Sequence, residues 1–136
     1  MIKGRYLETQ VEKIIAYLKT LGYWGQKNYP HRTDSGIYID GEPFDYYIIT
    51  NKAQLAFDAK ECNSARWQIR EKDIKQANNL VKLSRCGFDA FFLVYFVHED
   101  KVIKFDIATV MQTLSQGRKS MKSNEGKEYR FEDILK

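Results

Sequence analysis

Residues 44–61 carry the pattern that most restricts the fold of this chain, because a short polar turn separates two apolar-rich runs. The runs occupy positions 44–49 and 54–59, and their composition and spacing are typical of β-strands. Asn51, in the turn between them, tolerates the positive φ that a tight hairpin requires. We therefore predict a β-hairpin around which the rest of the chain is organised.

The turn also sets the register of the predicted hairpin. If Thr50 pairs with Ala53, Asp45 lies opposite Asp58 at roughly 5 Å. Lys60 shares the face of these acids because side chains alternate along a strand. The other face is apolar and is expected to pack into a core, with the pairs Ile48 and Leu55, Tyr46 and Phe57, and Phe44 and Ala59. The acids are thus predicted on the surface opposite the packed one.

The two facing acids, Asp45 and Asp58, indicate a metal site. Like charges that face each other on neighbouring strands repel unless a proton or a cation lies between them. Oxygen ligands suit Mg²⁺, which takes one or two carboxylates and completes its shell with water and phosphate oxygens. Lys60 is then placed to orient or activate a metal-bound water, or to neutralise charge that develops on a phosphate. The alternative is a surface hairpin with ordinary charges, which the Asp-Ala-Lys tripeptide alone would indicate.

Other segments alternate between helical and strand patterns. Apolar residues repeat at helical spacing in residues 6–21, namely Leu7, Val11, Ile14, Leu18 and Leu21, and Gly22 ends the repeat. Residues 88–97 are almost continuously apolar, which indicates a central strand covered on both faces. The remaining predictions are a loop or edge strand at 22–41, a loop at 63–71, a helix from a cap at Asp73 to about Cys86, a strand at 102–105, a helix at 107–114 capped by Asp106, a flexible basic loop at 116–127 and a tethering segment at 129–135. This order predicts an α/β fold, a sandwich with a central mixed β-sheet flanked by helices.

Length and composition favour a single domain that spans residues 1–136, because no linker or internal repeat divides the chain. No apolar run approaches the roughly 20 residues of a membrane span, and the N-terminus lacks an apolar signal core. We therefore expect a cytoplasmic protein without a membrane partner.

Positive charge gathers in two polar segments, residues 22–41 and 116–127, and the net charge of the chain is +4. This balance suits a polyanionic partner without requiring one. The candidate contacts to a nucleic-acid backbone are Lys27, His31, Arg32, Arg66, Arg118, Lys119 and Lys122. Solvated loops without a ligand are the alternative for these segments.

Short motifs along the chain resemble those of the PD-(D/E)XK nuclease superfamily and, within it, the RecU family of Holliday junction resolvases. Asp45 corresponds to the first acid, and Asp58-Ala59-Lys60 to the second acid, the spacer and the lysine. The family's Tyr-Pro-x-Arg, Phe-Glu-Ala-Lys-Glu and Gly-Arg-Lys-Ser-Ile segments are similar to YPHR at 29–32, FDAKE at 57–61 and GRKSM at 117–121. Gln76 resembles a family glutamine that follows a histidine, although Lys75 precedes it here.

The resemblance implies a restriction-endonuclease-like fold and a homodimeric, Mg²⁺-dependent endonuclease that nicks two opposed strands of a four-way DNA junction, with Mn²⁺ able to substitute. The implied catalytic residues are Asp45, Asp58, Lys60, Glu8 and Gln76, and the implied metal ligands are Asp45, Asp58, the backbone carbonyl of Ala59, and Glu8. Without the resemblance, Glu8 and Gln76 are ordinary surface residues. A recombinase is a further implied partner. The short segment 28–43 implies a reduced stalk, and the start at the first helix suggests a compact phage or bacterial member.

Two other functions fit the same residues. A nuclease of this type can act on duplex or single-stranded DNA instead of junctions, and competition between a junction and a linear duplex separates these cases. A protein with no catalytic role can bind junctions or assist a recombinase. Loss of cutting without loss of DNA binding in Lys60→Ala distinguishes an enzyme from such a protein.

Overall fold

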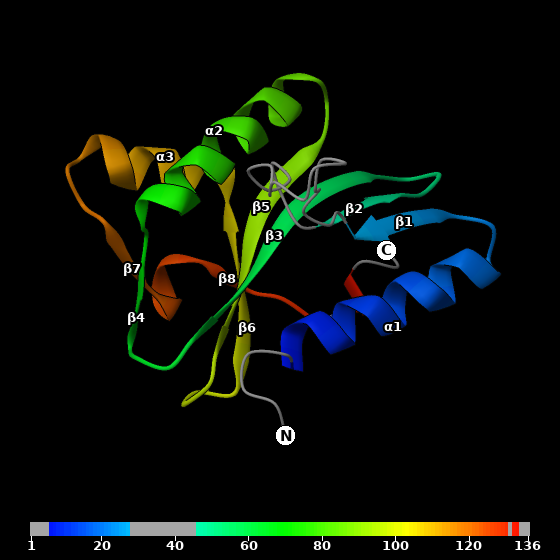
Figure 1. Cartoon of the computed structure of the whole chain (residues 1–136), viewed down its shortest axis with the longest axis horizontal. Coiled ribbons are helices and arrows are strands. Elements are labelled where there is room, and N and C mark those ends of the chain that lie inside the picture. Colours follow the sequence, from blue (N-terminus) through cyan, green and yellow to red (C-terminus); the bar gives the residue numbers. More distant parts are fainter. Residues whose placement is uncertain (1–5, 28–45, 131, 134–136) are drawn as a thin grey trace, which may run out of the picture.

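A computed structural model describes residues 6–27, 46–130 and 132–133. Figure 1 shows the arrangement of its helices and strands. In chain order, the elements are α1 (Tyr6–Thr20), β1 (Trp24–Lys27), β2 (Tyr46–Ile49), β3 (Gln54–Cys62), β4 (Arg66–Gln68), α2 (Glu71–Arg85), β5 (Asp89–Phe96), β6 (Lys101–Asp106), α3 (Ile107–Ser115), β7 (Ser120–Lys122), the short 3-10 helix η1 (Ser123–Glu125) and β8 (Lys127–Glu128). No helix among the described residues has both the length and the apolar character needed to cross a membrane.

A mixed six-stranded sheet forms the middle layer, with the strand order β1-β2-β3-β5-β6-β8. The central pair, β3 and β5, is parallel, and α2 provides the crossover between these two strands. The other neighbouring strands of the sheet are antiparallel. Helices flank this sheet on both sides, which confirms the predicted α/β sandwich with a central mixed sheet.

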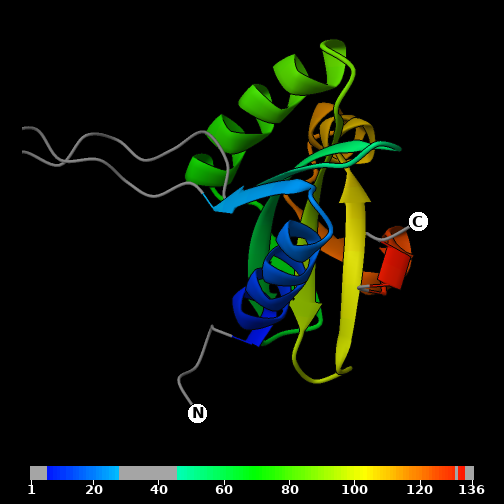
Figure 2. The same ribbon diagram turned by 90° about the vertical axis from the view of Figure 1, so that its right-hand side faces the viewer.

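The two faces of the sheet pack against different helices (Figures 1 and 2). On one face, α1 places Leu7 and Val11 against a cluster that includes Phe57 and Phe91. On the other face, α2 and α3 pack on a second cluster, which includes Phe92. Because side chains alternate along β3, the face that carries Asp58 and Lys60 is the one beneath α2.

The described part of the hairpin of β2 and β3 has the predicted register, whereas Phe44, the predicted partner of Ala59, lies outside the described residues. Tyr46 pairs with Phe57 and Ile48 with Leu55, and all four side chains are buried. The prediction of a positive φ at Asn51 is wrong, because Asp100 is the only non-glycine residue with a positive φ in the described parts of the chain. The hydroxyl of Thr50 instead accepts hydrogen bonds from the backbone N–H groups of Lys52 and Ala53, each at 3.1 Å. This side-chain contact stabilises the turn without a left-handed residue.

Two segments predicted as loops form a small antiparallel sheet instead. β4 pairs with β7, and Trp67 lies opposite Met121. Both of these side chains are buried, at 4% and 0% exposure, and their apolar contacts with the core explain why the segments are ordered strands. β8 then adds an edge strand to the main sheet, so the prediction of a flexible loop at 116–127 is wrong.

Most other helices and strands begin and end within one or two residues of the predicted positions. α1 buries Ile15 more completely than Ile14, and Leu21 lies outside the helix with 51% of its surface exposed. α2 begins at Glu71, so that Asp73 is its third residue rather than the residue before it. Asp106 occupies the N-cap position of α3 but makes no side-chain capping bond.

Candidate active site

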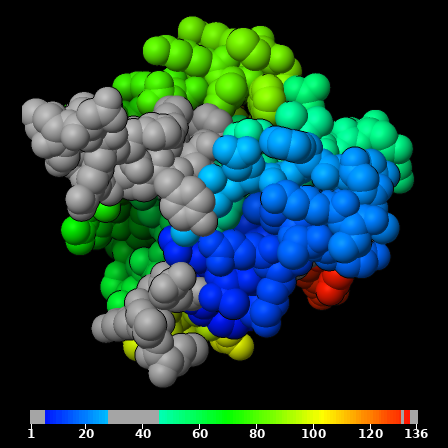
Figure 3. Space-filling model, turned by 45° about the vertical axis from the view of Figure 1, so that its right-hand side comes forward, coloured from blue at the N-terminus to red at the C-terminus, as the bar shows by residue number. Residues whose placement is uncertain are grey.

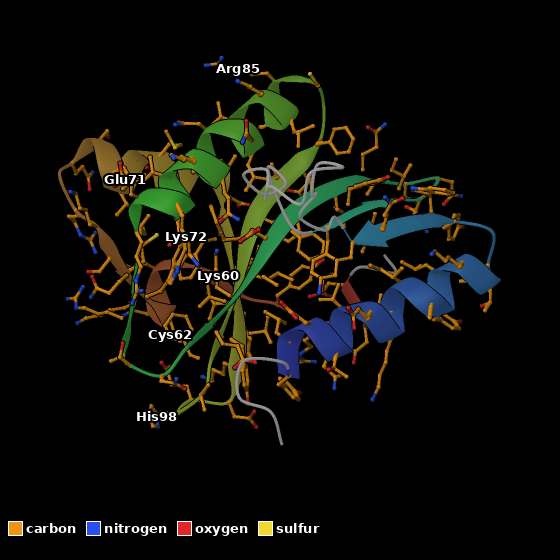
Figure 4. The ribbon with its side chains drawn as sticks, in the orientation of Figure 1. Lys60, Cys62, Glu71, Lys72, Arg85 and His98 are labelled. Atoms are coloured by element: carbon orange, nitrogen blue, oxygen red, sulfur yellow. The ribbon has the colours of Figure 1, made fainter. Side chains whose placement is uncertain are left out.

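Lys60 lies at the centre of a compact polar cluster between β3 and α2. Its Nζ atom is 2.8 Å from Oδ2 of Asp58 and 2.8 Å from Oδ1 of Asp73. The same ammonium donates a hydrogen bond of 2.9 Å to Oε1 of Gln76. In Figure 4, Lys60 extends from β3 towards the first turn of α2, where Glu71 and Lys72 lie. Two adjacent layers of the fold therefore build this cluster.

The acids of this cluster are deeply buried, which corrects the prediction of an acidic face on the surface. Asp58 is 0% exposed and Asp73 is 3% exposed, because α2 covers this side of β3. Buried carboxylates are stable only when they are paired and hydrogen-bonded. The shared ammonium of Lys60 supplies an ion-pair partner to both acids.

Asp73 connects the start of α2 to the lysine. Its Oδ2 atom accepts a hydrogen bond of 2.9 Å from the backbone N–H of Arg70, which would otherwise lack a partner inside the helix. Its Oδ1 atom contacts Lys60. The carboxylate thus holds the first turn of α2 and the ammonium in one geometry.

The ammonium of Lys60 is the favoured form in this environment. Burial acts to lower the pKa of Lys60, but the charges and hydrogen bonds of Asp58 and Asp73 outweigh it, so that the pKa is raised above its ordinary value. Lys60 is therefore a cation at neutral pH. A cation at this point can orient a hydrogen-bond acceptor or stabilise negative charge, whereas it cannot accept a proton.

The structure brings together three of the predicted catalytic residues, Asp58, Lys60 and Gln76, and adds Asp73, which was predicted only as a helix cap. A sequence signal for Asp73 did exist. Asp73 precedes Gln76 by three residues, which places both on one side of a helix. Asp45 lies outside the described residues, so its predicted position opposite Asp58 stays a prediction.

Glu8 lies in α1 and pairs with a lysine of the neighbouring strand. Nζ of Lys27 is 3.4 Å from Glu8 and 3.5 Å from Glu12. Figure 3 shows α1 and β1 next to each other on the surface, and Gly25 of β1 permits this approach, because a Cβ there would lie 3.0 Å from Ile15. The roles of Glu8 as a metal ligand and of Lys27 as a DNA contact stay predictions.

The described basic residues among the predicted DNA contacts differ in their surroundings. Arg118 forms a 2.6 Å ion pair with Glu125, whose pKa is lowered by a hydrogen bond from the backbone of Lys122 and by this arginine. Arg66 donates a hydrogen bond of 3.3 Å to the hydroxyl of Ser120. The side chain of Lys119 is exposed, as is that of Lys122. His31 and Arg32 lie outside the described residues.

The donors at this site fit a hard divalent cation in their chemistry. Asp58 offers carboxylate oxygens in a dry environment, and oxygen ligands are those that Mg²⁺ prefers. The described residues contain no group of three or more His, Cys, Asp or Glu side chains that could hold a metal. A complete ligand shell therefore requires further donors, for which the predicted candidates are Asp45, the backbone carbonyl of Ala59 and Glu8.

The fold is similar to those of two nucleases. One is Hjc, a Holliday junction resolvase from the archaeal hyperthermophile Archaeoglobus fulgidus, with a TM-score of 0.56 and 14% sequence identity over 93% of each chain. The other is D212, a nuclease from a fusselovirus, with a TM-score of 0.50 and 14% identity over 94% of this chain and 83% of the other. No curated protein matches the sequence significantly. At these identities the likeness concerns the fold, which is restriction-endonuclease-like.

The class is thus that of a restriction-endonuclease-like fold, in which the lysine–carboxylate cluster lies between β3 and α2. The family model of RecU, Recombination protein U, matches residues 2–135. The chain belongs to the RecU family, as its motifs predicted. Nucleases of this resolvase family generally need a divalent metal.

Proposed function

We propose that this protein is a structure-selective, Mg²⁺-dependent DNA endonuclease that resolves four-way junctions by paired nicks during recombination or replication. The observation that carries the proposal is the ammonium of Lys60, which lies 2.8 Å from each of two buried carboxylates. Membership of the RecU family and the likeness to an archaeal junction resolvase support the same reaction and a branched DNA substrate.

Each residue of the cluster has a separate task in the proposed site. The proposed metal ligands are Asp58, Asp45, the backbone carbonyl of Ala59 and, from α1, Glu8. When bound, Mg²⁺, or Mn²⁺ in its place, neutralises charge on the scissile phosphate and makes a nearby water more acidic. Lys60 stabilises the negative charge that develops on the phosphate, because it is an ammonium held by fixed partners. Gln76 and Asp73 keep that ammonium in place.

We infer that residues 1–136 form one nuclease domain and that two copies act together. Paired nicks on opposed strands need two active sites, which a symmetric homodimer supplies. Light scattering of the purified protein, alone and with a junction, measures this assembly. A monomer in both conditions would leave paired nicking without a structural basis.

A cleavage assay with a labelled four-way junction tests the proposed reaction. The wild-type protein should cut the junction when Mg²⁺ is added and should not cut it in EDTA. Asp58→Asn replaces a metal-binding carboxylate by a neutral side chain of the same shape, so it should bind the junction and cut at least a hundredfold more slowly, roughly the effect of losing one key electrostatic contact. Equal cutting by both proteins would refute the proposed site.

Competition between substrates tests the structural selectivity. An unlabelled junction should inhibit cleavage of the labelled junction at much lower concentration than a linear duplex of the same sequence. Equal competition by both DNAs would favour a nuclease that acts on duplex DNA. Tight binding without cleavage under any metal would favour a binding protein.

A further inference from the structure

A polar pocket of about 460 Å³ opens beside Lys60. The end of β3, the strand β4 and the first turn of α2 form its walls, and Trp67 lines it as well. Figure 4 shows Lys60 and Lys72 close to each other at this place, whereas Arg85 lies at the other end of α2. The pocket is therefore continuous with the proposed active site.

Positive charge dominates the wall of this pocket. Arg66, Arg70 and Lys72 line it, and none of the three forms an ion pair with any of the described residues. All three are exposed to solvent. Their charges are thus available to an anion from solution.

The acidic residues of the wall are already engaged elsewhere. Oε1 of Glu61 accepts hydrogen bonds from the backbone N–H groups of Tyr6, at 2.9 Å, and Leu7, at 3.4 Å, at the start of α1. Asp73 uses one oxygen for Lys60 and the other for the backbone of Arg70. Because that backbone N–H is occupied, an anion in the pocket would contact the basic side chains and not the amide of Arg70.

We propose that this pocket binds a backbone phosphate of the cleaved DNA strand, next to the phosphate at Lys60. The proposal rests on the proposed nuclease function and adds a second point of attachment to the same strand. Arg70 and Lys72, which no sequence motif indicated, are its main contacts, and Arg66 lies across the pocket. Two attachment points fix the direction of the strand across the site, because one phosphate contact alone leaves the strand free to rotate.

The test uses junctions in which one phosphate at a time is replaced by a neutral methylphosphonate. Binding is measured in EDTA for the wild-type protein and for a double variant, Arg70→Gln with Lys72→Gln. The matched control is Lys82→Gln with Arg85→Gln, which removes two exposed charges from the other end of the same helix. Circular dichroism confirms that each protein is folded.

We expect one methylphosphonate near the cut to weaken DNA binding by the wild-type protein and by the control variant roughly tenfold. The same methylphosphonate should weaken DNA binding by the double variant less than about twofold, because this variant lacks the side chains that bind that phosphate. The slope of log K against log salt concentration should fall by about 1 in the double variant, the change expected when one phosphate is no longer neutralised. The control should keep the wild-type slope. The proposal would be overturned if a methylphosphonate at every position of the junction weakened DNA binding equally for all three proteins.

The outcomes separate this proposal from the proposed function. Junction cleavage in Mg²⁺ without any position-specific effect would leave the nuclease intact and remove the phosphate pocket. A position-specific effect on binding without cleavage would support the pocket and remove the nuclease. Absence of DNA binding would overturn both.

Discussion

Two of the clusters in this protein place one lysine between two carboxylates in very different surroundings. Lys60 lies 2.8 Å from Asp58 and 2.8 Å from Asp73, and their side chains are 0% and 4% exposed. Lys27 lies 3.4 Å from Glu8 and 3.5 Å from Glu12, and these side chains are 30% and 41% exposed. The first cluster lies beneath α2, and the second lies on the edge between α1 and β1.

The difference shows that burial, and not composition, decides what such a cluster can do. Exposed ion pairs are screened by water and salt and contribute about 0–1 kcal/mol. In a buried cluster, removal of one partner leaves a charge without compensation and costs several kcal/mol. Fixed geometry and strong coupling are the conditions that electrostatic catalysis needs. The following predictions test this contrast.

The largest effect is expected from removal of the buried ammonium. Lys60→Met keeps the length of the side chain and leaves Asp58 and Asp73 without the cation that they share, so the free energy of unfolding should fall by about 3–5 kcal/mol. Lys27→Met should lower it by less than about 1 kcal/mol. Urea unfolding monitored by circular dichroism measures both values. Similar losses in the two variants would mean that the burial of the first cluster has no energetic consequence.

Asp73→Asn should have a smaller effect, because Lys60 keeps Asp58 as a partner. The single oxygen of the new amide can still accept from the backbone N–H of Arg70, so the start of α2 is preserved. The amide NH2 group then faces the ammonium of Lys60, so the charge-assisted contact is lost, at a cost of about 1.5–3 kcal/mol. Junction cleavage should slow by roughly tenfold, since the ammonium is held less firmly.

Asp106→Asn is the matched control for that substitution, because Asp106 stands at the start of α3 without a side-chain capping bond. Its free energy of unfolding should stay within about 0.5 kcal/mol of the wild-type value. If the two variants behaved alike, the role of Asp73 would be reduced to that of an ordinary residue in a first helical turn.

Gln76→Leu should cost about 1 kcal/mol, the usual value of one hydrogen bond, because the ammonium loses its neutral acceptor but keeps both acids. Gln76→Glu is the informative companion, since it restores an acceptor and adds a third carboxylate next to Lys60. Urea unfolding and junction cleavage measure both variants. Full activity of Gln76→Leu would remove Gln76 from the proposed site.

The hairpin was predictable from the sequence because one register satisfies both the turn and the apolar face. Tyr46 and Phe57 pair as the alternation of β2 and β3 requires. The deep burial of Asp58 was not predictable from the hairpin, because it depends on where α2 lies. Packing of Ala77 and Leu80 against the sheet, at long range, sets that position.

The pairing of β4 with β7 illustrates the same limit. Each strand has only three residues, too few for a period to be recognised, and Arg66 pairs with Lys122 from a distant part of the chain. Their single buried residues, Trp67 and Met121, look like isolated apolar residues in polar loops. The second contact of Asp73 was missed for a related reason, since an acid in the first helical turn ordinarily serves the helix alone.

The smallest effect on stability is expected within the exposed cluster, where it separates two roles for one residue. Glu8→Gln and Glu12→Gln each remove one weak pair with Lys27, so each should lower the free energy of unfolding by less than about 1 kcal/mol. If Glu8 is a metal ligand as well, Glu8→Gln should also raise the Mg²⁺ concentration needed for half-maximal cleavage, by roughly tenfold or more. Glu12→Gln should leave that concentration unchanged, because Glu12 has no place in the proposed site. A metal titration of junction cleavage with both variants decides the matter, and an identical Mg²⁺ dependence would assign Glu8 to the exposed cluster alone.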